Sequence, residues 1–506
     1  MRTFRDAIDA HAVARPDAPC VIAPEPEAVL TYGDLARIGA ELGAFLAQQG
    51  IAPGTVVSFM LPNGVAAASI FLGAMYAGYI ISPVNLLAQD TQLEYTLAHS
   101  GTRLIFAAPE FVDRLRALLR RTNHPALVHA TGADRLELSE EPAAPLAAVD
   151  PHTPAMLMYT SGTTGEPKGV LLSHWNLIYA GRVVAEALAL RAEDRVLSSL
   201  PLYHINGQSI ATVSPVVSGG SIVMPHRFSA SQWWPLVERY RPTWLNMVPT
   251  IIAYLLNGPE LTPSQAGACR ALRFGRTASA PLPLEQHRAF EARFGISVIE
   301  AMGLTETASI AFANPLDPKK RKYGSAGVPL GVEARVVAAD GAVLGAGEQG
   351  EIELRGEAVM TGYYRNAELT AQVLSPDGWL ATGDLGYRDG DGFYFITGRR
   401  KELIIKGGEN IAPREIDEAL LSHPAVLEAA AVGIPDSNYG QDILACIVLK
   451  PGACCDEAEL RAHCLTQLGR YKTPRLLRFV AALPKGPSGK VQRLKLAALR
   501  GEGDDE

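Results

Sequence analysis

The segment best suited to chemistry runs Tyr159-Thr-Ser-Gly-Thr-Thr-Gly-Glu-Pro-Lys-Gly169. Its three glycines let the backbone approach a ligand closely and expose N–H donors, and four hydroxyl side chains and one lysine lie among them. Such a loop binds a triphosphate or pyrophosphate through main-chain N–H groups, hydroxyls and a movable cation. It is not a Walker A loop, because that motif needs glycine where Pro167 stands. The alternative is a polar surface loop between residues 156–159 and 170–173.

Alternating helix and strand patterns surround this segment. Residues 31–50 predict a helix, since Leu35, Ile38, Leu42 and Phe45 form one apolar stripe. Helix-then-strand units recur through residue 250, which predicts α/β layers with largely parallel sheets. From about 325 to 400 the pattern changes to short β-like runs separated by Gly and Asp turns. After Lys401 helix and strand patterns alternate again.

These patterns predict an α/β fold with two unequal domains. The large N-terminal domain, 1–398, consists of layered α/β subdomains and a β-rich subdomain at about 325–398. The roughly 105 residues that follow are enough for a small α+β domain. Within the β-rich part, Gly345-Ala-Gly-Glu-Gln-Gly350 matches the dinucleotide fingerprint, but a strand pattern follows it where a helix is required. We interpret it as a hairpin turn.

Composition excludes several classes of function. The chain has 506 residues and a formal charge of −7, so it is not a general nucleic-acid binder, which would need surplus Lys and Arg. Six scattered cysteines show no zinc-binding spacing, and the charged N-terminus shows no secretory signal. The apolar stretch from Ala66 to Val84 contains small residues at helical spacing, which favours a buried helix and strand over a membrane span. We therefore expect a cytoplasmic protein.

Further motifs follow the phosphate loop in a fixed order. They are Pro201-Leu-Tyr-His-Ile-Asn-Gly207, Met302-Gly-Leu-Thr-Glu306, Gly324-Ser-Ala-Gly-Val-Pro329, Thr382-Gly-Asp-Leu385, Gly398-Arg-Arg-Lys-Glu402, Lys406-Gly-Gly-Glu-Asn-Ile-Ala-Pro413 and Pro484-Lys-Gly-Pro-Ser-Gly-Lys490. With these motifs the chain resembles, over nearly its whole length, the acyl-adenylate-forming superfamily. That superfamily includes acyl-CoA synthetases, adenylation domains of peptide synthetases and beetle luciferases.

The resemblance implies a ligase that joins a carboxylic acid to AMP, using ATP and Mg²⁺, and then transfers the acyl group to coenzyme A. Both steps develop negative charge, which fixed cations and N–H donors stabilise. Thr163, Thr164 and Lys168 would hold the β- and γ-phosphates, and Glu306, with Thr163, would hold Mg²⁺. Asp384 would accept hydrogen bonds from both ribose hydroxyls.

The other nucleotide contacts implied by the resemblance are Thr160, Ser161, Gly162, Gly165, Ser279, Ala280, Met302, Gly303, Thr305 and Arg399. Among them Thr305 would meet the α-phosphate, and the small residues around Ser279 would admit the adenine ring. Met302 stands where the family usually has an aromatic residue that stacks on adenine. A thioether still packs on a ring face, so we expect a modest effect on ATP affinity.

The C-terminal part is implied to act as a mobile lid domain, 402–506, behind a hinge at 399–401. Lys490 resembles the catalytic lysine that bridges the substrate carboxylate and the α-phosphate. The domain would then rotate about Lys401 and bring Gly407 and Gly408 to the pantetheine arm of CoA. Two half-reactions would in this way share one pocket. Acetylation of Lys490 is a further hypothesis, since it would neutralise that ammonium.

Polar residues in the expected acyl site bear on which acid is used. His204, Arg227, Asn246 and Arg276 would line it. Because Lys490 already serves the reacting carboxylate, a further buried arginine favours a short acid with a second anionic group, such as oxalate, malonate or sulfoacetate. The pattern also resembles oxalate–CoA and malonate–CoA ligases. In the alternative, Arg276 pairs with a protein acid such as Glu300 and the substrate is a medium- or long-chain fatty acid or an aromatic acid.

Other classes remain open at this stage. The acyl group could load a separate carrier protein, although no carrier domain follows Lys490. A luciferase-like oxidase shares the adenylation motifs, and a non-catalytic nucleotide-binding regulator would be expected to lack Lys168, Glu306, Asp384 or Lys490. The expected partners are small molecules, without nucleic acid, and a homodimer is possible.

Overall fold

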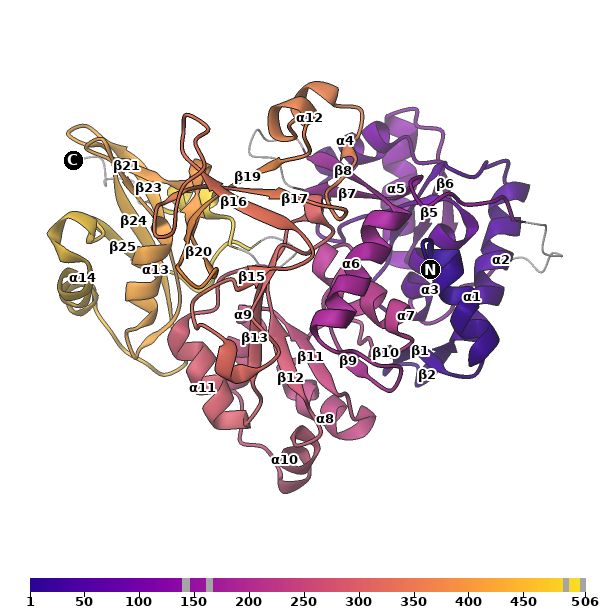
Figure 1. Ribbon diagram of the computed structural model, residues 1–506, viewed down its shortest axis with the longest axis horizontal. Coiled ribbons are helices and arrows are strands. Elements are labelled where there is room, and N and C mark those ends of the chain that lie inside the picture. The colour runs from indigo at the N-terminus through magenta and orange to yellow at the C-terminus, as the bar shows by residue number, and fades with distance from the viewer. Residues whose placement is uncertain (139–145, 161–166, 486–490, 501–506) are drawn as a thin grey trace.

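The computed structural model describes residues 1–138, 146–160, 167–485 and 491–500 (Figure 1). Three sheets lie between the N-terminus and Arg399, and a fourth follows Glu402. In Figure 1 the C-terminal sheet, in orange to yellow, stands at one end of the molecule, and the N-terminal helices, in indigo, stand at the other. The fold is therefore α/β with a large N-terminal part and a smaller C-terminal part, as the sequence predicts.

One sheet has seven strands in the order β18-β8-β7-β4-β3-β5-β6. Its strands are β3 (Val56–Met60), β4 (Ile80–Pro83), β5 (Leu104–Ala107), β6 (Leu127–Ala130), β7 (Pro154–Thr160), β8 (Lys168–Ser173) and β18 (Gly362–Tyr363). The half from β7 to β6 is parallel, whereas β8 and β18 pair antiparallel. The sheet is thus largely parallel, as predicted, with an antiparallel edge, because too few residues separate β7 from β8 for a parallel crossover.

A second sheet has nine strands in the order β15-β14-β13-β12-β11-β9-β10-β1-β2. Its strands are β1 (Pro19–Ala23), β2 (Ala28–Thr31), β9 (Arg195–Leu197), β10 (Ser221–Val223), β11 (Trp244–Met247), β12 (Phe274–Thr277), β13 (Val298–Met302), β14 (Phe312–Ala313) and β15 (Val328–Pro329). The central strands from β13 to β1 run parallel. Their carboxyl ends therefore meet at one edge of the sheet, where ligands bind in α/β proteins.

Helices cover both sheets. They are α1 (Phe4–Ala14), α2 (Tyr32–Gln48), α3 (Val65–Ala77), α4 (Asp90–Ser100), α5 (Pro109–Arg121), α6 (His174–Ala187), α7 (Ser214–Ser218), α8 (Ala230–Tyr240), α9 (Pro249–Leu256), α10 (Pro263–Cys269), α11 (Leu284–Phe294) and α12 (Ala367–Val373). Helix α2 confirms the apolar stripe predicted for residues 31–50, and a capping box between Thr31 and Asp34 begins it.

The apolar stretch from Ala66 to Val84 is a buried helix and strand. Helix α3 is buried around its whole circumference from Ala66 to Ala77, and the strand β4 that follows is buried too. Small residues let α2 and α3 pack closely, since a Cβ added at Gly39 of α2 would lie 2.5 Å from the Tyr76 ring, and one at Gly73 of α3 would lie 3.5 Å from the Gly39 Cα. In the described part of the chain, all helices are too short or too polar to cross a membrane.

The β-rich part forms a separate four-stranded antiparallel sheet, β16 (Glu333–Val337), β17 (Gly350–Arg355), β19 (Leu380–Arg388) and β20 (Tyr394–Arg399). Because β16 and β17 are antiparallel neighbours and β17 begins at Gly350, the glycine-rich segment before it connects two paired strands. This confirms that the apparent dinucleotide fingerprint is part of a hairpin connection.

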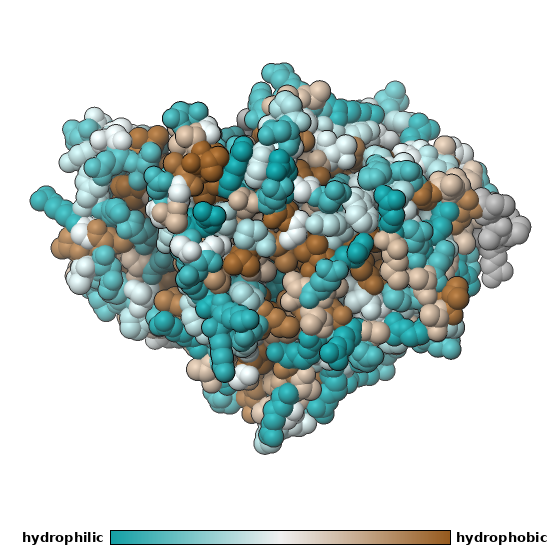
Figure 2. All heavy atoms as spheres, viewed as in Figure 1, coloured by the Kyte–Doolittle hydropathy of each residue, from teal (hydrophilic) through white to brown (hydrophobic). Residues whose placement is uncertain are grey.

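The C-terminal part has its own sheet and core. Its elements are β21 (Ile404–Lys406), β22 (Glu409–Ile411), α13 (Pro413–Leu421), β23 (Val426–Asp436), β24 (Gly440–Leu449), α14 (Glu457–Lys472) and β25 (Leu476–Phe479). Helix α13 contacts the N-terminal part, where the Arg414 guanidinium donates to the Ile396 carbonyl at 2.5 Å. The face seen in Figure 2 is mainly hydrophilic, with hydrophobic side chains in small separate groups.

Candidate functional site

The predicted phosphate loop connects β7 and β8 in the sequence, and these strands form an antiparallel hairpin whose last paired residues are Thr160 and Lys168. Both therefore flank the loop, one on each strand. Five predicted contacts, Ser161, Gly162, Thr163, Thr164 and Gly165, lie outside the described residues, and so does Lys490. Their roles stay predictions.

Lys168, Glu306 and Lys401 lie close enough for the charges of Lys401 and Glu306 to act on Lys168. Glu306 belongs to a short 3₁₀ helix, Thr305–Thr307, and Lys401 to another, Arg400–Glu402. Burial lowers the pKa of Lys168, the charge of Lys401 lowers it further, and the Glu306 carboxylate acts in the opposite sense. Two ammonium groups that repel each other are both stabilised by a nearby anion. The residues present thus fit a nucleotide triphosphate, with Glu306 as an oxygen ligand suited to Mg²⁺.

Asp384 and Arg399 face each other across strands β19 and β20. The Arg399 Nε lies 2.8 Å from Asp384 Oδ1, and Nη2 donates to Oδ2 at 3.4 Å. The Asp384 side chain is buried, and its charge raises the pKa of Arg399 above the usual value. The arginine therefore fixes the carboxylate that is predicted to bind the ribose hydroxyls.

The stretch expected to line adenine follows the carboxyl end of β12. Ser279 adopts a left-handed φ of 76°, and its hydroxyl accepts a hydrogen bond from Asn206 Nδ2 at 3.2 Å. Ala280 and Met302 are half-buried, and Met302 pairs with Phe312 on β14. Gly303 admits no side chain, because a Cβ there would lie 2.1 Å from the Ser309 carbonyl oxygen.

Arg276 lies in the middle of the expected acyl site. It is only 2% exposed, and Asn246 is its neighbour on β11. Its Nη1 donates to Asn206 Oδ1 at 3.2 Å and to Asn246 Oδ1 at 3.3 Å, while Asn246 Nδ2 donates to Asn206 Oδ1 at 3.2 Å. Burial lowers the pKa of Arg276 to about 10, so the guanidinium still carries its charge at neutral pH. Asn206 belongs to the Pro201–Gly207 motif, but sequence reasoning did not predict that it joins Arg276 to Ser279.

The alternative in which Arg276 pairs with Glu300 is wrong. The Glu300 carboxylate instead accepts the N–H of Leu282 at 3.1 Å. Within the described ranges Arg276 has no acidic partner. Among the described residues, its side-chain hydrogen bonds go to the neutral carboxamides of Asn206 and Asn246.

The other two predicted acyl residues are less central. His204 is half-buried, and its Nδ1 accepts the Asn206 N–H at 3.3 Å, so it lies beside the Arg276 group. Arg227 is exposed, and the described contacts do not link it to that group. Its neighbour His226 bonds Asp134 at 2.8 Å.

Gly407 and Gly408 form the turn between β21 and β22, with φ of 54° and 86°. The Gly407 N–H donates to the Tyr439 carbonyl at 2.8 Å, and a Cβ at Gly407 would lie 2.9 Å from the Tyr471 hydroxyl. Lys406, just before them, forms a buried ion pair with Asp442 at 2.5 Å. This turn is thus held rigidly within the C-terminal part.

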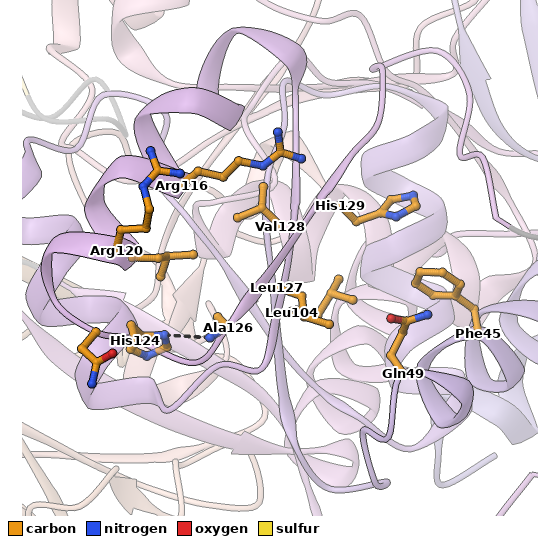
Figure 3. A pocket seen from close by; sticks show the side chains of 12 residues that line it. Phe45, Gln49, Leu104, Arg116, Arg120, His124, Ala126, Leu127, Val128 and His129 are labelled. Carbon is orange, nitrogen blue, oxygen red and sulfur yellow. Dashed lines mark hydrogen bonds between the residues drawn. The ribbon is translucent and has the colours of Figure 1, made fainter.

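Two other features lie apart from these residues. A groove of about 680 Å³ beside α5 and β6 is lined by Arg116, Arg120, His124 and His129, without any predicted site residue (Figure 3). His423, Cys455 and Glu459 place ligand atoms within 4.8 Å of one another. However, His423 Nδ1 accepts the Ala425 N–H at 3.3 Å, which leaves the ring proton on Nε2, facing Glu459. We therefore interpret this trio as a hydrogen-bonded group.

Comparison with known proteins agrees with this geometry. The family model "AMP-binding enzyme" matches residues 8–364, and "AMP-binding enzyme C-terminal domain" matches 415–490. A sulfoacetate–CoA ligase of Cupriavidus necator is 55% identical over 98% of this chain and 97% of its own length. An oxalate–CoA ligase of Arabidopsis thaliana is 33% identical, with 88% of each chain covered.

Solved structures also match this chain over nearly its whole length. ATP-bound MatB from Rhodopseudomonas palustris superposes with a TM-score of 0.88 at 30% identity, covering 98% of this chain and 99% of that one. The order of motifs, the paired cations beside the β7–β8 hairpin and relatives that span the whole chain lead to one conclusion. The chain belongs to the AMP-binding enzyme family and is an AMP-forming acid–CoA ligase.

Proposed function

We propose that this ligase activates a short carboxylic acid that carries a second anionic group, with sulfoacetate the preferred member of the class. The observation that carries the proposal is Arg276, a buried guanidinium among the described residues without an acidic partner. A buried charge without a counter-ion is costly, and a substrate anion removes that cost on binding. The name and 55% identity of the Cupriavidus relative support a sulfonate as that anion.

In the proposed site the two ends of the acid meet different cations. The second anion lies against Arg276, with Asn206 and Asn246 holding the guanidinium in place. The reacting carboxylate points toward Lys490 and the α-phosphate. Lys168 and Glu306 serve the phosphates and Mg²⁺, and Asp384 with Arg399 serves the ribose. We further propose that residues 402–506 form the lid domain, with its hinge at Lys401. We also propose that the enzyme works in the cytoplasm and forms a homodimer.

A pyrophosphate-release screen tests the substrate class. Sulfoacetate, oxalate and malonate should outperform butyrate, octanoate and benzoate in kcat/KM, because only the first three offer an anion to Arg276. A thiol-consumption readout with free CoA separates CoA transfer from carrier-protein loading. If octanoate or benzoate is the best substrate, the proposal is wrong.

A further inference from the structure

Tyr363 lies between the two residues that we assign to the phosphates and the metal. It belongs to the two-residue edge strand β18, which pairs with β8 just after the phosphate loop. The Tyr363 N–H donates to Thr370 Oγ1 at 2.9 Å, and the next N–H, of Tyr364, donates to the Gly169 carbonyl at 2.7 Å. The first bond holds the Tyr363 backbone against helix α12, and the second holds the segment against β8, the strand that carries Lys168.

The Tyr363 side chain contacts both charged groups. Its hydroxyl donates to Glu306 Oε1 at 2.9 Å, and the Lys168 Nζ lies 5.2 Å from the centre of its ring. The same segment also holds the Glu306 backbone, since the Met360 N–H donates to the Glu306 carbonyl at 2.7 Å.

Lys168 and Glu306 carry opposite charges and influence each other, yet they form no ion pair in the described structure. Tyr363 contacts the two groups in different ways. Its hydroxyl donates a hydrogen bond to the carboxylate, and the face of its ring lies against the ammonium. A direct pair would neutralise the two groups that must meet phosphate and Mg²⁺.

We propose that Tyr363 is a positioning residue that keeps Glu306 and Lys168 apart and oriented, so that each is available to the ATP–Mg²⁺ complex. The inference rests on the roles proposed above for those two residues. It assigns separate tasks to the two parts of one side chain. The hydroxyl orients the carboxylate toward the metal, and the ring supports the ammonium that meets the phosphates.

Two substitutions separate these tasks. Tyr363→Phe removes the hydroxyl and keeps the ring, so the Mg²⁺ concentration for half-maximal binding of ATP should rise about ten- to a hundredfold, the effect of one hydrogen bond to a charged group. Tyr363→Leu removes both, and affinity for the nucleotide at saturating Mg²⁺ should fall by a further two- to fivefold. Tyr364→Phe is the matched control, since it deletes a hydroxyl at the adjacent position.

Calorimetric titration with a non-hydrolysable ATP analogue at graded Mg²⁺ measures both effects without any acid substrate. This binding readout tests only the role of Tyr363. The substrate proposal is tested separately, by the acid screen. Thermal unfolding of each variant confirms that it is folded. Mg²⁺ dependence equal in Tyr363→Phe and Tyr364→Phe would overturn the inference. So would a loss of binding that is the same at every Mg²⁺ concentration, because that result indicates a merely structural role.

Discussion

Arg276 and Glu300 lie on adjacent parallel strands, but their side chains point to opposite faces of the sheet. The register pairs Arg276 with Ile299 and Thr277 with Glu300. Because successive residues of a strand alternate between faces, Glu300 shares a face with Thr277, and Arg276 shares one with Asn246. The pleat of the sheet therefore prevents an ion pair between Arg276 and Glu300.

Arg276→Met removes the buried charge while keeping most of the side-chain volume. We expect kcat/KM for sulfoacetate to fall by about 100-fold or more, since a desolvated charge pair with the substrate is lost. The rate with butyrate should stay equal or rise. Pyrophosphate release with both acids measures this, and an equal loss with both would contradict the assignment of Arg276 to the second anion.

Asn206→Asp tests the same site without changing its shape. A carboxylate oxygen would then lie where Oδ1 now accepts from Arg276 at 3.2 Å, and it would supply the acid partner that the guanidinium lacks. The KM for sulfoacetate should rise about tenfold or more, because the substrate anion must compete with an internal one. Asn206→Ala is the control and should have a smaller effect. A KM unchanged in Asn206→Asp would count against the proposal.

Glu300→Gln should stabilise the protein, and the gain should grow with pH. Burial raises the pKa of Glu300, while Arg414 and His287 lower it and Glu418 raises it. A raised folded-state pKa gives stability that is present below the unfolded value of 4.5 and is lost as pH rises through the folded value. Glutamine cannot ionise, so it avoids the cost of a buried negative charge. Its amide would take the place of Oε2, which has no hydrogen-bond partner among the described residues. At pH 8 we expect about 1 to 3 kcal/mol in its favour.

Denaturant unfolding at pH 5 and pH 8 measures this difference. Glu291→Gln is the control of opposite sign. Burial alone would raise the pKa of Glu291, but hydrogen bonds from His287, Tyr323 and the Val298 N–H lower it to about 2. That variant should be destabilised at both pH values. A Glu300→Gln variant that loses stability as pH rises would refute the electrostatic account.

Gly303→Ala should destabilise the protein by at least about 2 kcal/mol, because its Cβ would lie 2.1 Å from the Ser309 carbonyl and the backbone must move. Gly267→Ala, in helix α10, is the control. Its Cβ would meet nothing within 4 Å, so the same substitution should be neutral or stabilising there. Thermal unfolding compares the two. Equal melting temperatures would show that the Gly303 backbone is not constrained.

Local sequence alone predicted several elements of the fold and the candidate residues of the nucleotide site. The stripe over α2, the strands β16 and β17 and the buried nature of α3 follow from periodicity and short-range turn chemistry. The phosphate loop, Glu306, Asp384 and Arg399 lie in contiguous motifs, and the roles predicted for them rest on the family resemblance that these motifs carry. These signals are local, and no distant contact is needed to see them.

Only the tertiary structure decided which side chains meet. Asn206, Asn246 and Arg276 come from three separate segments. Strand register pairs Asn246 with Arg276 and excludes Glu300, while Asn206 reaches them from the π-helix Asn206–Val213. The role inferred for Tyr363 depends on an edge strand that joins β8 from about 190 residues away. A sequence states residue types, but pairing across a sheet selects the face and neighbour of each side chain, and burial then sets the energetic cost of its charge.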